Sequence, residues 1–295
     1  MRVVLGFPME DEQTGVYIKN VFIENGCEVV GIHDPKREAP DVMLRLAERL
    51  KPDLIFMSRS IPYVHVIAWL KKISICTFWN VDVRYNIREW SALYPLMEGC
   101  HFWFTIAKGN IPEYKAAGLG TPYWLSEGCD RIHRLRPGGK TNEHDVFFAG
   151  SIGNVHEDRK RIVSTVKTIF KNSNIVNGLY LVNEDHNDAV GMAKVCLGHS
   201  GWPGVELSMS ARDYRVMGAG GFLLTNHVEG IENWFDLDKE CVTYSSPTDC
   251  IEKIRYYLAH DKEREKIAAA GYNAAHKKHR FKNRIAEVLD IAGRG

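Results

Sequence analysis

The chain has 295 residues, enough for two domains of ordinary size, and its hydrophobic fraction of 45% and charged fraction of 25% are normal for a globular protein. A formal net charge of +1 excludes the overall basic field of a strong nucleic-acid binder, although it leaves room for a local basic patch. The seven cysteines are odd in number and form no C-x-x-C pair, which argues against structural zinc and a disulfide framework and favours reduced thiols in a cytoplasmic protein. We also expect no signal peptide and no membrane span, because no apolar stretch has the required length or flanks.

Short β-rich runs alternate with helical patterns through the first half of the chain. The expected strands are continuous apolar runs of the kind that is buried on both faces of a sheet. They lie at residues 3–7, 28–33, 53–58, 74–79, 101–106 and 122–125. Helical patterns separate them at residues 14–25, 40–50, 64–72, 89–97 and 112–117. This alternation predicts a parallel sheet covered by helices.

The segment 126–145 changes character, because it is polar and rich in glycine, proline and charge, and we interpret it as a linker. The alternation then restarts with expected strands at residues 145–149, 175–182, 194–197, 222–225 and 242–244. Expected helices lie at residues 157–170, 185–193, 247–259, 262–279 and 281–292. The predicted fold is therefore α/β, with two Rossmann-like domains at 1–140 and 141–295 and a last helix that can cross back to the first domain.

Residues 208–224 carry the strongest local signal for a ligand. Arg212 and Arg215 lie three residues apart, so a helix places them on one face. Gly220 and Gly221 follow and lead into an apolar run, which predicts a cationic helix, a glycine break and a buried strand. Guanidinium groups beside a tight glycine turn suit a bound diphosphate. A solvated helix that ends at a glycine cap fits the same pattern equally well.

Other candidate residues follow predicted strands, where α/β proteins bind their ligands. The backbone N–H groups of Gly150-Ser151-Ile152-Gly153 can cradle a phosphate, although a plain tight turn fits this loop too. His199 can donate to a phosphate or simply bond the backbone of its own loop. Asp82 can orient or deprotonate an acceptor hydroxyl, or it can be an N-cap or a turn residue. Trp79 can stack on a sugar, although a core tryptophan is the commoner case.

The second half resembles the C-terminal domain of GT-B glycosyltransferases, and within them the spore-maturation CgeB-like group related to glycosyltransferase family 4. The resemblance is carried by Asp-Val-Phe-Phe-Ala-Gly-Ser-Ile-Gly at 145–153 with Arg159 behind it, by the segment 212–225, and by the tail 251–279. It covers residues 145–290. The first half resembles the group in layout and in Trp79-Asn-Val-Asp82, which is similar to a Trp-x-x-Asp segment.

This resemblance implies a GT-B fold whose two domains face a cleft, and a hexosyltransferase (EC 2.4) that moves a sugar from a nucleoside-diphosphate sugar such as a UDP-sugar to an acceptor hydroxyl with retention. The donor would bind the second domain and the acceptor the first. We expect Asp82 and His199 to be catalytic. The residues expected to bind the nucleotide sugar are Gly150, Ser151, Gly153, Arg159, Arg212, Tyr214, Arg215, Gly220 and Gly221.

We expect no cofactor beyond the co-substrate and no metal, because arginines and helix N-termini can stabilise the leaving diphosphate and no convincing pair of acidic ligands is present. The acceptor stays open among polysaccharide, protein, lipid and a modified DNA base.

One position departs from the family pattern. Members often carry a glutamate that holds the ribose where this chain has Arg215, and the earlier glutamate of the pattern would fall on Leu207, one place from Glu206. Either Arg215 binds the diphosphate and the ribose contact has moved, or the nucleotide site is degraded. The second alternative favours a non-catalytic GT-B-like protein that binds a nucleotide or a sugar. A sugar-nucleotide epimerase or a phosphorylase is a third, weaker interpretation.

Overall fold

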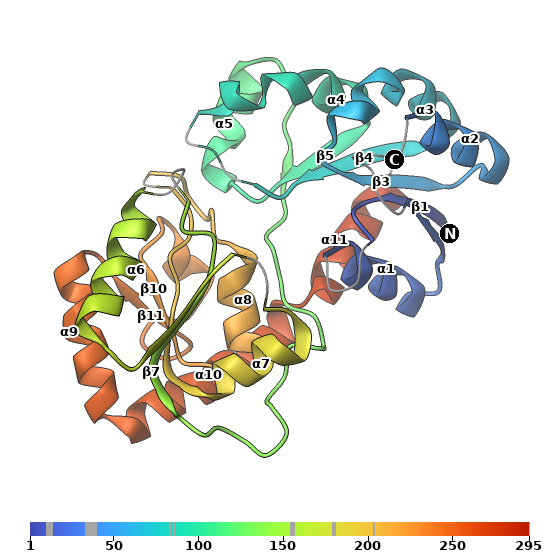
Figure 1. The fold of residues 1–295 in the computed structure, drawn as a ribbon. Coiled ribbons are helices and arrows are strands. Elements are labelled where there is room, and N and C mark those ends of the chain that lie inside the picture. Colours follow the sequence, from blue (N-terminus) through green and yellow to red (C-terminus); the bar gives the residue numbers. More distant parts are fainter. Residues whose placement is uncertain are drawn as a thin grey trace. The chain divides into compact units, whose positions relative to one another are not determined.

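The computed structural model describes residues 1–9, 14–32, 40–82, 84, 86–153, 157–178, 181–202 and 204–294. The chain divides into two compact units, each built on one parallel sheet with helices packed on it (Figure 1). Unit 1 comprises Met1–Glu127, Trp202–Ser208 and Phe281–Gly295, and unit 2 comprises Gly128–Gly201 and Met209–Arg280. The predicted α/β class with two Rossmann-like domains is confirmed.

Unit 1 contains a six-stranded parallel sheet in the order β2-β1-β3-β4-β5-β6. Its strands are β1 (Arg2–Gly6), β2 (Glu28–Gly31), β3 (Leu54–Ser58), β4 (Ile75–Asn80), β5 (Phe102–Thr105) and β6 (Tyr123–Trp124). Strand β3 is buried along its whole length, as its continuous apolar run predicts.

The helices of unit 1 cover both faces of this sheet (Figure 1). They are α1 (Thr14–Glu24), α2 (Pro40–Leu50), α3 (Ile67–Ile73), α4 (Tyr94–Gly99), α5 (Ile111–Ala116) and α11 (Phe281–Gly293). Short 3₁₀ helices lie at η1 (Ile61–His65), η2 (Ile87–Leu93) and η3 (Lys108–Asn110). The helix expected at 89–97 is thus split into η2 and α4, and Pro95, in the first turn of α4, explains the break because it has no N–H to continue the preceding helix.

The last helix belongs to the core of unit 1. Phe281 of α11 stacks on Tyr17 of α1, with ring centroids 5.9 Å apart, and meets Trp79 edge-on at 6.4 Å. The Nε1 group of the fully buried Trp79 donates to the Leu125 carbonyl at 3.0 Å. Arg284 Nε donates to the Ser126 carbonyl at 3.0 Å. Trp79 is therefore a core residue, and α11 lies outside the unit that contains most of the predicted second domain.

Unit 2 contains a five-stranded parallel sheet in the order β11-β10-β9-β7-β8. Its strands are β7 (His144–Gly150), β8 (Ser173–Asn177), β9 (Ala193–Leu197), β10 (Leu223–Asn226) and β11 (Val242–Tyr244). Its helices are α6 (Glu157–Ile169), α7 (Asn183–Gly191), α8 (Ala211–Gly218), α9 (Pro247–Ala259) and α10 (Asp261–Lys278), with a 3₁₀ turn η4 (Ile231–Asn233). The strand expected at 175–182 lies at Ser173–Asn177, and Gly178, which follows it, has a φ of +115° that does not continue a strand.

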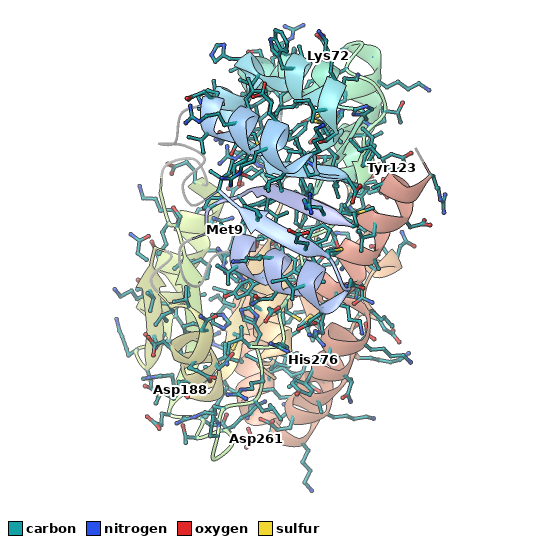
Figure 2. All side chains as sticks on the ribbon, turned by 90° about the vertical axis from the view of Figure 1, so that its right-hand side faces the viewer. Met9, Lys72, Tyr123, Asp188, Asp261 and His276 are labelled. Atoms are coloured by element: carbon teal, nitrogen blue, oxygen red, sulfur yellow. The ribbon has the colours of Figure 1, made fainter. Side chains whose placement is uncertain are left out.

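Alternate side chains of the central strand β7 face the two helix layers of unit 2. Val146 and Phe148 join a core cluster with residues of α6, α9 and α10, whereas the Phe147 ring lies 6.2 Å from His186 of α7 on the other face. His276 of α10, which is labelled in Figure 2, donates to the Gly218 carbonyl of α8 at 2.9 Å. Lys72 and Asp261, labelled in the same view, are exposed. The layers of unit 2 are thus held by an apolar centre and by bonds between helices.

The segment interpreted as a linker is largely part of unit 2. The Cys129 N–H donates to the His279 carbonyl at 2.9 Å, and Asn187 Nδ2 donates to the Ile132 carbonyl at 2.7 Å. His133 in the same segment is 1% exposed. The boundary predicted at residue 140 therefore lies between Glu127 and Gly128 in the structure. A polar composition is compatible with this packing because the polar groups of the segment bond to neighbouring backbone.

A short excursion of the chain also belongs to unit 1. Within Trp202–Ser208, Lys108 Nζ pairs with Glu206 Oε1 at 2.6 Å, and the Gly109 N–H donates to the Glu206 carbonyl at 3.0 Å. A Cβ on Gly109 would come 2.5 Å from the Glu206 nitrogen, so this approach of two backbones requires glycine. Among the described residues, no helix combines the length and apolarity needed to cross a membrane.

Candidate functional site

The carboxyl edge of the unit 2 sheet gathers most of the predicted donor-binding residues. Because all strands of this sheet are parallel, the loops that follow β7, β9 and β10 leave from the same edge. Arg159 lies in the first turn of α6 and Arg212 in the first turn of α8, so both follow strand ends by one loop. The fold therefore places two cations at the edge where ligands of α/β proteins bind.

Arg212 is held against the end of β7. Its Nε donates to the Ala149 carbonyl at 2.6 Å and its Nη1 to the His199 carbonyl at 3.2 Å. The guanidinium carbon lies 4.8 Å from the centroid of the Phe148 ring, within cation–π range. Gly150 has a φ of +151°, and a Cβ there would lie 2.1 Å from Arg212 Nη2. Glycine at 150 is thus a condition for the observed position of Arg212.

Arg159 donates to the same His199 carbonyl as Arg212 does. Its Nε donates to the His199 carbonyl at 3.0 Å and its Nη1 to the Ser151 carbonyl at 3.2 Å, and the residue is 7% exposed. Burial, with the charge of Arg212 as a further cause, lowers the pKa of Arg159 to about 10. Burial likewise lowers the pKa of Arg212. At pH 7 Arg159 still carries its charge, as does an arginine in nearly every protein environment.

Asp213 is the negative charge beside this pair. It is 1% exposed, and burial raises the pKa of its carboxyl group, while Arg212 and then Arg159 act in the opposite direction. A Cβ on Gly198 would lie 2.7 Å from Asp213 Oδ1, so the carboxylate packs directly against the end of β9. Two guanidinium groups and one carboxylate leave a positive balance, which favours an anionic ligand.

His199 is oriented by Tyr244 at the end of β11. The Tyr244 hydroxyl lies 2.8 Å from His199 Nδ1 and donates to the Gly198 carbonyl at 3.0 Å. Because a carbonyl can only accept, the hydroxyl proton points at Gly198 and Nδ1 of the histidine donates to the hydroxyl oxygen. The neutral ring then has an acceptor at Nε2, so His199 donates to a phosphate from Nε2 only as an imidazolium.

Two asparagines that the sequence analysis did not single out fix the loops of the site. Asn226, the last residue of β10, accepts from the Ser200 N–H at 2.6 Å and donates to the Ser200 carbonyl at 2.8 Å. Asn177, the last residue of β8, accepts from the Ile152 N–H at 3.0 Å. The Gly153 N–H donates to Ser151 Oγ at 3.4 Å. Two backbone donors expected to cradle a phosphate are therefore bonded within the protein.

The glycine pair after α8 forms a helix cap. Gly220 has a φ of +77° and donates to the Met217 carbonyl, and Gly221 donates to the Val216 carbonyl, both at 2.9 Å. These are the two bonds of a Schellman motif. The cap lies where α8 leads into β10, at the opposite edge of the sheet from Gly150. Gly220 and Gly221 thus end α8 as a glycine cap, which is the second of the two structures that the sequence pattern allowed.

Tyr214 and Arg215 also have surroundings of their own. Tyr214 is fully buried, and its hydroxyl accepts from Trp234 Nε1 at 2.9 Å. Arg215 lies near two buried histidines, because its charge contributes, after burial, to the lowered pKa of both His133 and His186. Arg212 joins Arg159 at the His199 carbonyl, whereas the charge of Arg215, three residues further along, acts on the two histidines.

Asp82 lies in unit 1, just after β4. Its carboxylate pairs with Arg59, which follows β3, and the two side chains are 44% and 39% exposed. The residue is thus at the carboxyl edge of its sheet, as predicted, and it is engaged by a cation.

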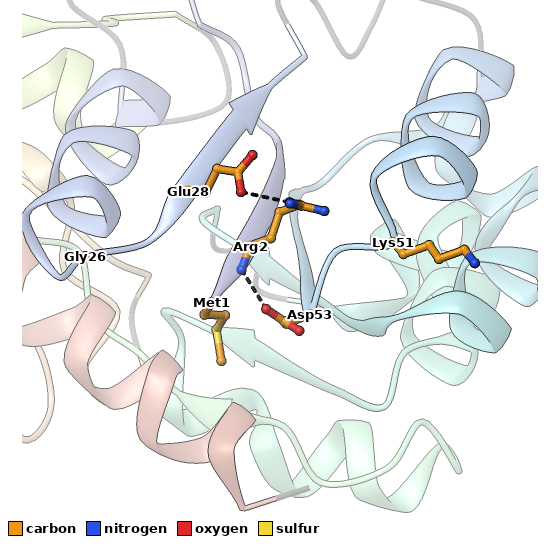
Figure 3. Close-up of a pocket in the computed structure, with 6 residues that line it drawn as sticks. All are labelled: Met1, Arg2, Gly26, Glu28, Lys51 and Asp53. Carbon is orange, nitrogen blue, oxygen red and sulfur yellow. Dashed lines mark hydrogen bonds and ion pairs between the residues drawn. The ribbon is translucent and has the colours of Figure 1, made fainter.

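A surface hollow of about 390 Å³ in unit 1 lies away from these residues (Figure 3). It is lined by Met1, Arg2, Gly26, Glu28, Lys51 and Asp53. The Arg2 N–H donates to Asp53 at 2.6 Å, and Arg2 Nε pairs with Glu28 at 2.9 Å. These residues begin strands or precede them, so the hollow opens at the amino edge of the sheet. Within the ranges that the structure describes, no group of three His, Cys, Asp or Glu residues could hold a metal ion.

Two units, each a parallel sheet covered by helices, correspond to the two Rossmann-like domains of the GT-B fold. The chain belongs to the glycosyl transferase-like family, whose model matches residues 141–290. A search of curated proteins finds no match.

Solved structures of GT-B proteins share the fold over the whole chain. HepE of Anabaena in complex with UDP-glucose has a TM-score of 0.68 at 11% identity, covering 98% of this chain and 99% of its own. Sucrose-phosphate synthase from Thermosynechococcus elongatus has a TM-score of 0.69 at 9% identity, covering 100% and 98%. A Listeria monocytogenes protein described as a UDP-N-acetylglucosamine 2-epimerase reaches 0.57 at 11% identity, covering 98% and 95%. At such low identities these similarities establish the fold alone.

Proposed function

We propose that this protein is a glycosyltransferase that moves a sugar from a nucleoside-diphosphate sugar to an acceptor hydroxyl. The observation that carries the proposal is the convergence of Arg159 and Arg212 on one carbonyl at the carboxyl edge of the unit 2 sheet. Membership of the glycosyl transferase-like family supports it. A UDP-sugar is the first donor to test, because HepE, which has the same fold, was solved with UDP-glucose.

In this proposal the diphosphate binds beside the two arginines and the N-termini of α6 and α8. Negative charge develops on the diphosphate as the glycosidic bond breaks, and fixed guanidinium groups stabilise that charge without reorganisation. The helix N-termini add donors of the same sign. Gly150, Ser151 and Gly153 shape the loop around the donor. No metal is required for the step, because Arg159 and Arg212 supply the positive charge.

Four of the predicted binding residues act indirectly in the proposed site. Tyr214 anchors α8 through the contact of its hydroxyl with Trp234, and Gly220 and Gly221 anchor the helix by capping its C-terminus. The anchored helix in turn positions Arg212. Arg215, on the same helix, adds positive charge at longer range. The positions 145–153 and 212–225 also support placing the chain in the CgeB-like group.

The proposed stereochemical outcome is retention. In a retaining transfer of the family 4 type, the leaving phosphate can accept the proton of the acceptor hydroxyl, so a strong base is not needed. Asp82 would then orient the acceptor hydroxyl, and His199 would contact the donor phosphate as an imidazolium.

Thermal unfolding with nucleotides tests the donor site. Unfolding temperatures of the wild type and of the Arg159→Ala, Arg212→Ala and Arg161→Ala variants would be measured with UDP, GDP, ADP and TDP. A ligand at a hundred times its Kd stabilises the folded state by about 2.7 kcal/mol. We expect one nucleotide to stabilise the wild type and Arg161→Ala, whose side chain is exposed, and to stabilise the other two variants much less. If all four nucleotides leave the transition unchanged, the proposal fails.

A non-catalytic nucleotide-binding protein is the second candidate, and Arg215 in the place of the family glutamate favours it. NMR of the stabilising nucleotide's sugar conjugate separates the two. Slow release of the sugar in its original anomeric form, unaffected by EDTA, supports retaining and metal-independent transfer. Binding without turnover on a broad acceptor panel supports the non-catalytic protein.

A further inference from the structure

The carboxyl edge of the unit 1 sheet carries two arginines on one tryptophan. The guanidinium carbon of Arg59 lies 5.0 Å from the centroid of the Trp90 ring, and that of Arg84 lies 5.3 Å from it. Trp90, in η2, is 7% exposed and therefore a fixed platform. Arg59 follows β3 and Arg84 follows β4, so both leave from the edge where parallel sheets bind ligands.

Each of these cations already has a carboxylate. Asp82 pairs with Arg59, and Glu89 Oε2 lies 3.5 Å from Arg84 Nε. The carboxylates are 44% and 53% exposed, so neither pair is sealed from water. The contact with Asp82 indicates that the guanidinium of Arg59 is positioned to bind an oxyanion at this edge.

We infer that the acceptor carries an anionic group, a phosphate monoester or a carboxylate, which binds Arg59 and displaces Asp82 from it. The inference rests on the proposed function, because it names the chemistry of the acceptor that unit 1 would bind. Asp82 is then an internal competitor in the empty protein and becomes available to the acceptor hydroxyl once the anion is bound.

The exchange is physically favourable. An exposed ion pair contributes little to stability, so the loss of the Asp82 contact costs little. Phosphate and carboxylate groups bind the guanidinium fork in a bidentate manner, which a point cation cannot do. Because the Trp90 ring holds the guanidinium by its own contact, Arg59 keeps its position while the oxyanion changes.

If Asp82 competes with the anion for Arg59, substitutions of the two residues should have opposite effects on anion binding. Removing the charge of Arg59 removes the site, so anion binding weakens. Removing the charge of Asp82 removes the competitor, so anion binding strengthens. If the ion pair served only the stability of unit 1, the two substitutions would not have opposite effects on anion binding.

The test is a ligand-observed NMR titration of the full chain at physiological salt. The probes are glucose 6-phosphate, glucuronate, inorganic phosphate and neutral glucose. The variants are Arg59→Gln, Asp82→Asn and Arg45→Gln, the last being a control from another exposed arginine–aspartate pair, on α2. Thermal unfolding with and without UDP is recorded on the same samples, which reports separately on unit 2 and on the fold of each variant.

We expect glucose 6-phosphate or glucuronate to bind saturably and glucose to bind far more weakly, and the preferred anion identifies the phosphate or carboxylate class. Arg59→Gln should weaken that binding about tenfold or more, as loss of a charged hydrogen bond implies. Asp82→Asn should strengthen it severalfold, and Arg45→Gln should leave it unchanged.

The inference is overturned if no anionic probe binds saturably, if Arg59→Gln binds as the wild type does, or if Asp82→Asn weakens binding. When UDP still stabilises the protein in that case, the proposed function survives without the anionic acceptor. If UDP, GDP, ADP and TDP all fail to stabilise the protein while an anionic probe still binds in an Arg59-dependent way, the proposed function is refuted and the anion site is retained.

Discussion

Replacing Arg212 by alanine tests the link between the geometry of unit 2 and donor binding. The side chain donates to the Ala149 and His199 carbonyls at 2.6 and 3.2 Å and packs on Phe148. A hydrogen bond from a charged group to the diphosphate is worth about 1.5–3 kcal/mol. Its loss corresponds to a Kd raised about tenfold to a hundredfold.

The assay is isothermal titration of the stabilising nucleotide into four variants. Arg212→Ala and Arg159→Ala should weaken binding by the amount just given, because both guanidinium groups reach the His199 carbonyl. Arg161→Ala, on the exposed side of α6, is the matched control and should bind as the wild type does. Arg215→Ala should fall between them, because Arg215 lies nearer the two buried histidines.

The comparison also decides between two descriptions of α8. If Arg212→Ala is folded and its Kd stays within about twofold of the wild-type value, the arginine pair is not the diphosphate site. Equal losses for Arg212→Ala and Arg215→Ala would favour the shared helix face expected from spacing alone, and would refute the separate environments described for unit 2.

Three further predictions concern single buried positions. Gly150→Ala should destabilise the protein by about 1–3 kcal/mol in urea unfolding, because the backbone conformation at this position suits glycine. The nucleotide affinity of the variant should drop to that of Arg212→Ala, because the added Cβ would displace Arg212. Wild-type affinity would contradict the packing described for Arg212. Burial lowers the pKa of His186 from 6.5 to about 3, so the folded state binds fewer protons than the unfolded state between these pH values. His186 therefore lowers the free energy of unfolding by up to about 1.4 kcal/mol for each unit by which the pH decreases through that window. Urea unfolding at pH 5 and pH 6.5 should show a smaller difference for His186→Phe than for the wild type, and an unchanged difference would count against a neutral buried histidine. Trp79→Phe should lower the unfolding temperature, because it deletes the buried bond to Leu125, yet leave nucleotide binding and sugar probes unaffected; a selective loss of sugar binding would instead support a stacking role.

Strand positions were predictable because each buried strand is one continuous apolar run. The run at 53–58 corresponds to β3, and that at 222–225 overlaps β10 at Leu223–Asn226. The course of the segment 126–145 was not predictable from composition, since its contacts to Asn187 and His279 depend on helices far along the chain. Helical spacing likewise predicted a shared face for Arg212 and Arg215, but it could not show that His133 of this segment lies within reach of the Arg215 charge.

The site was predictable where a residue ends a strand or follows its end within two residues. Gly150, His199 and Asp82 meet that condition, and the structure locates each at a carboxyl edge. Asn177 and Asn226 meet it as well, and a polar residue that closes an apolar run was an available signal for both. Asp213 gave no such signal, because its burial beside Arg159 and Arg212 arises only when β7, β9 and α8 come together.

The interleaved course of the chain constrains how such a protein can be dissected or recombined. The chain changes unit four times, after Glu127, Gly201, Ser208 and Arg280. A fragment cut at residue 141 would lose the buried His133 and would expose Phe281 and Ile285, both fully buried in the intact chain. Exchange of halves between relatives by a single crossover would therefore break both cores. A chimera that keeps both cores intact must take residues 128–201 and 209–280 from one relative and residues 1–127, 202–208 and 281–295 from the other.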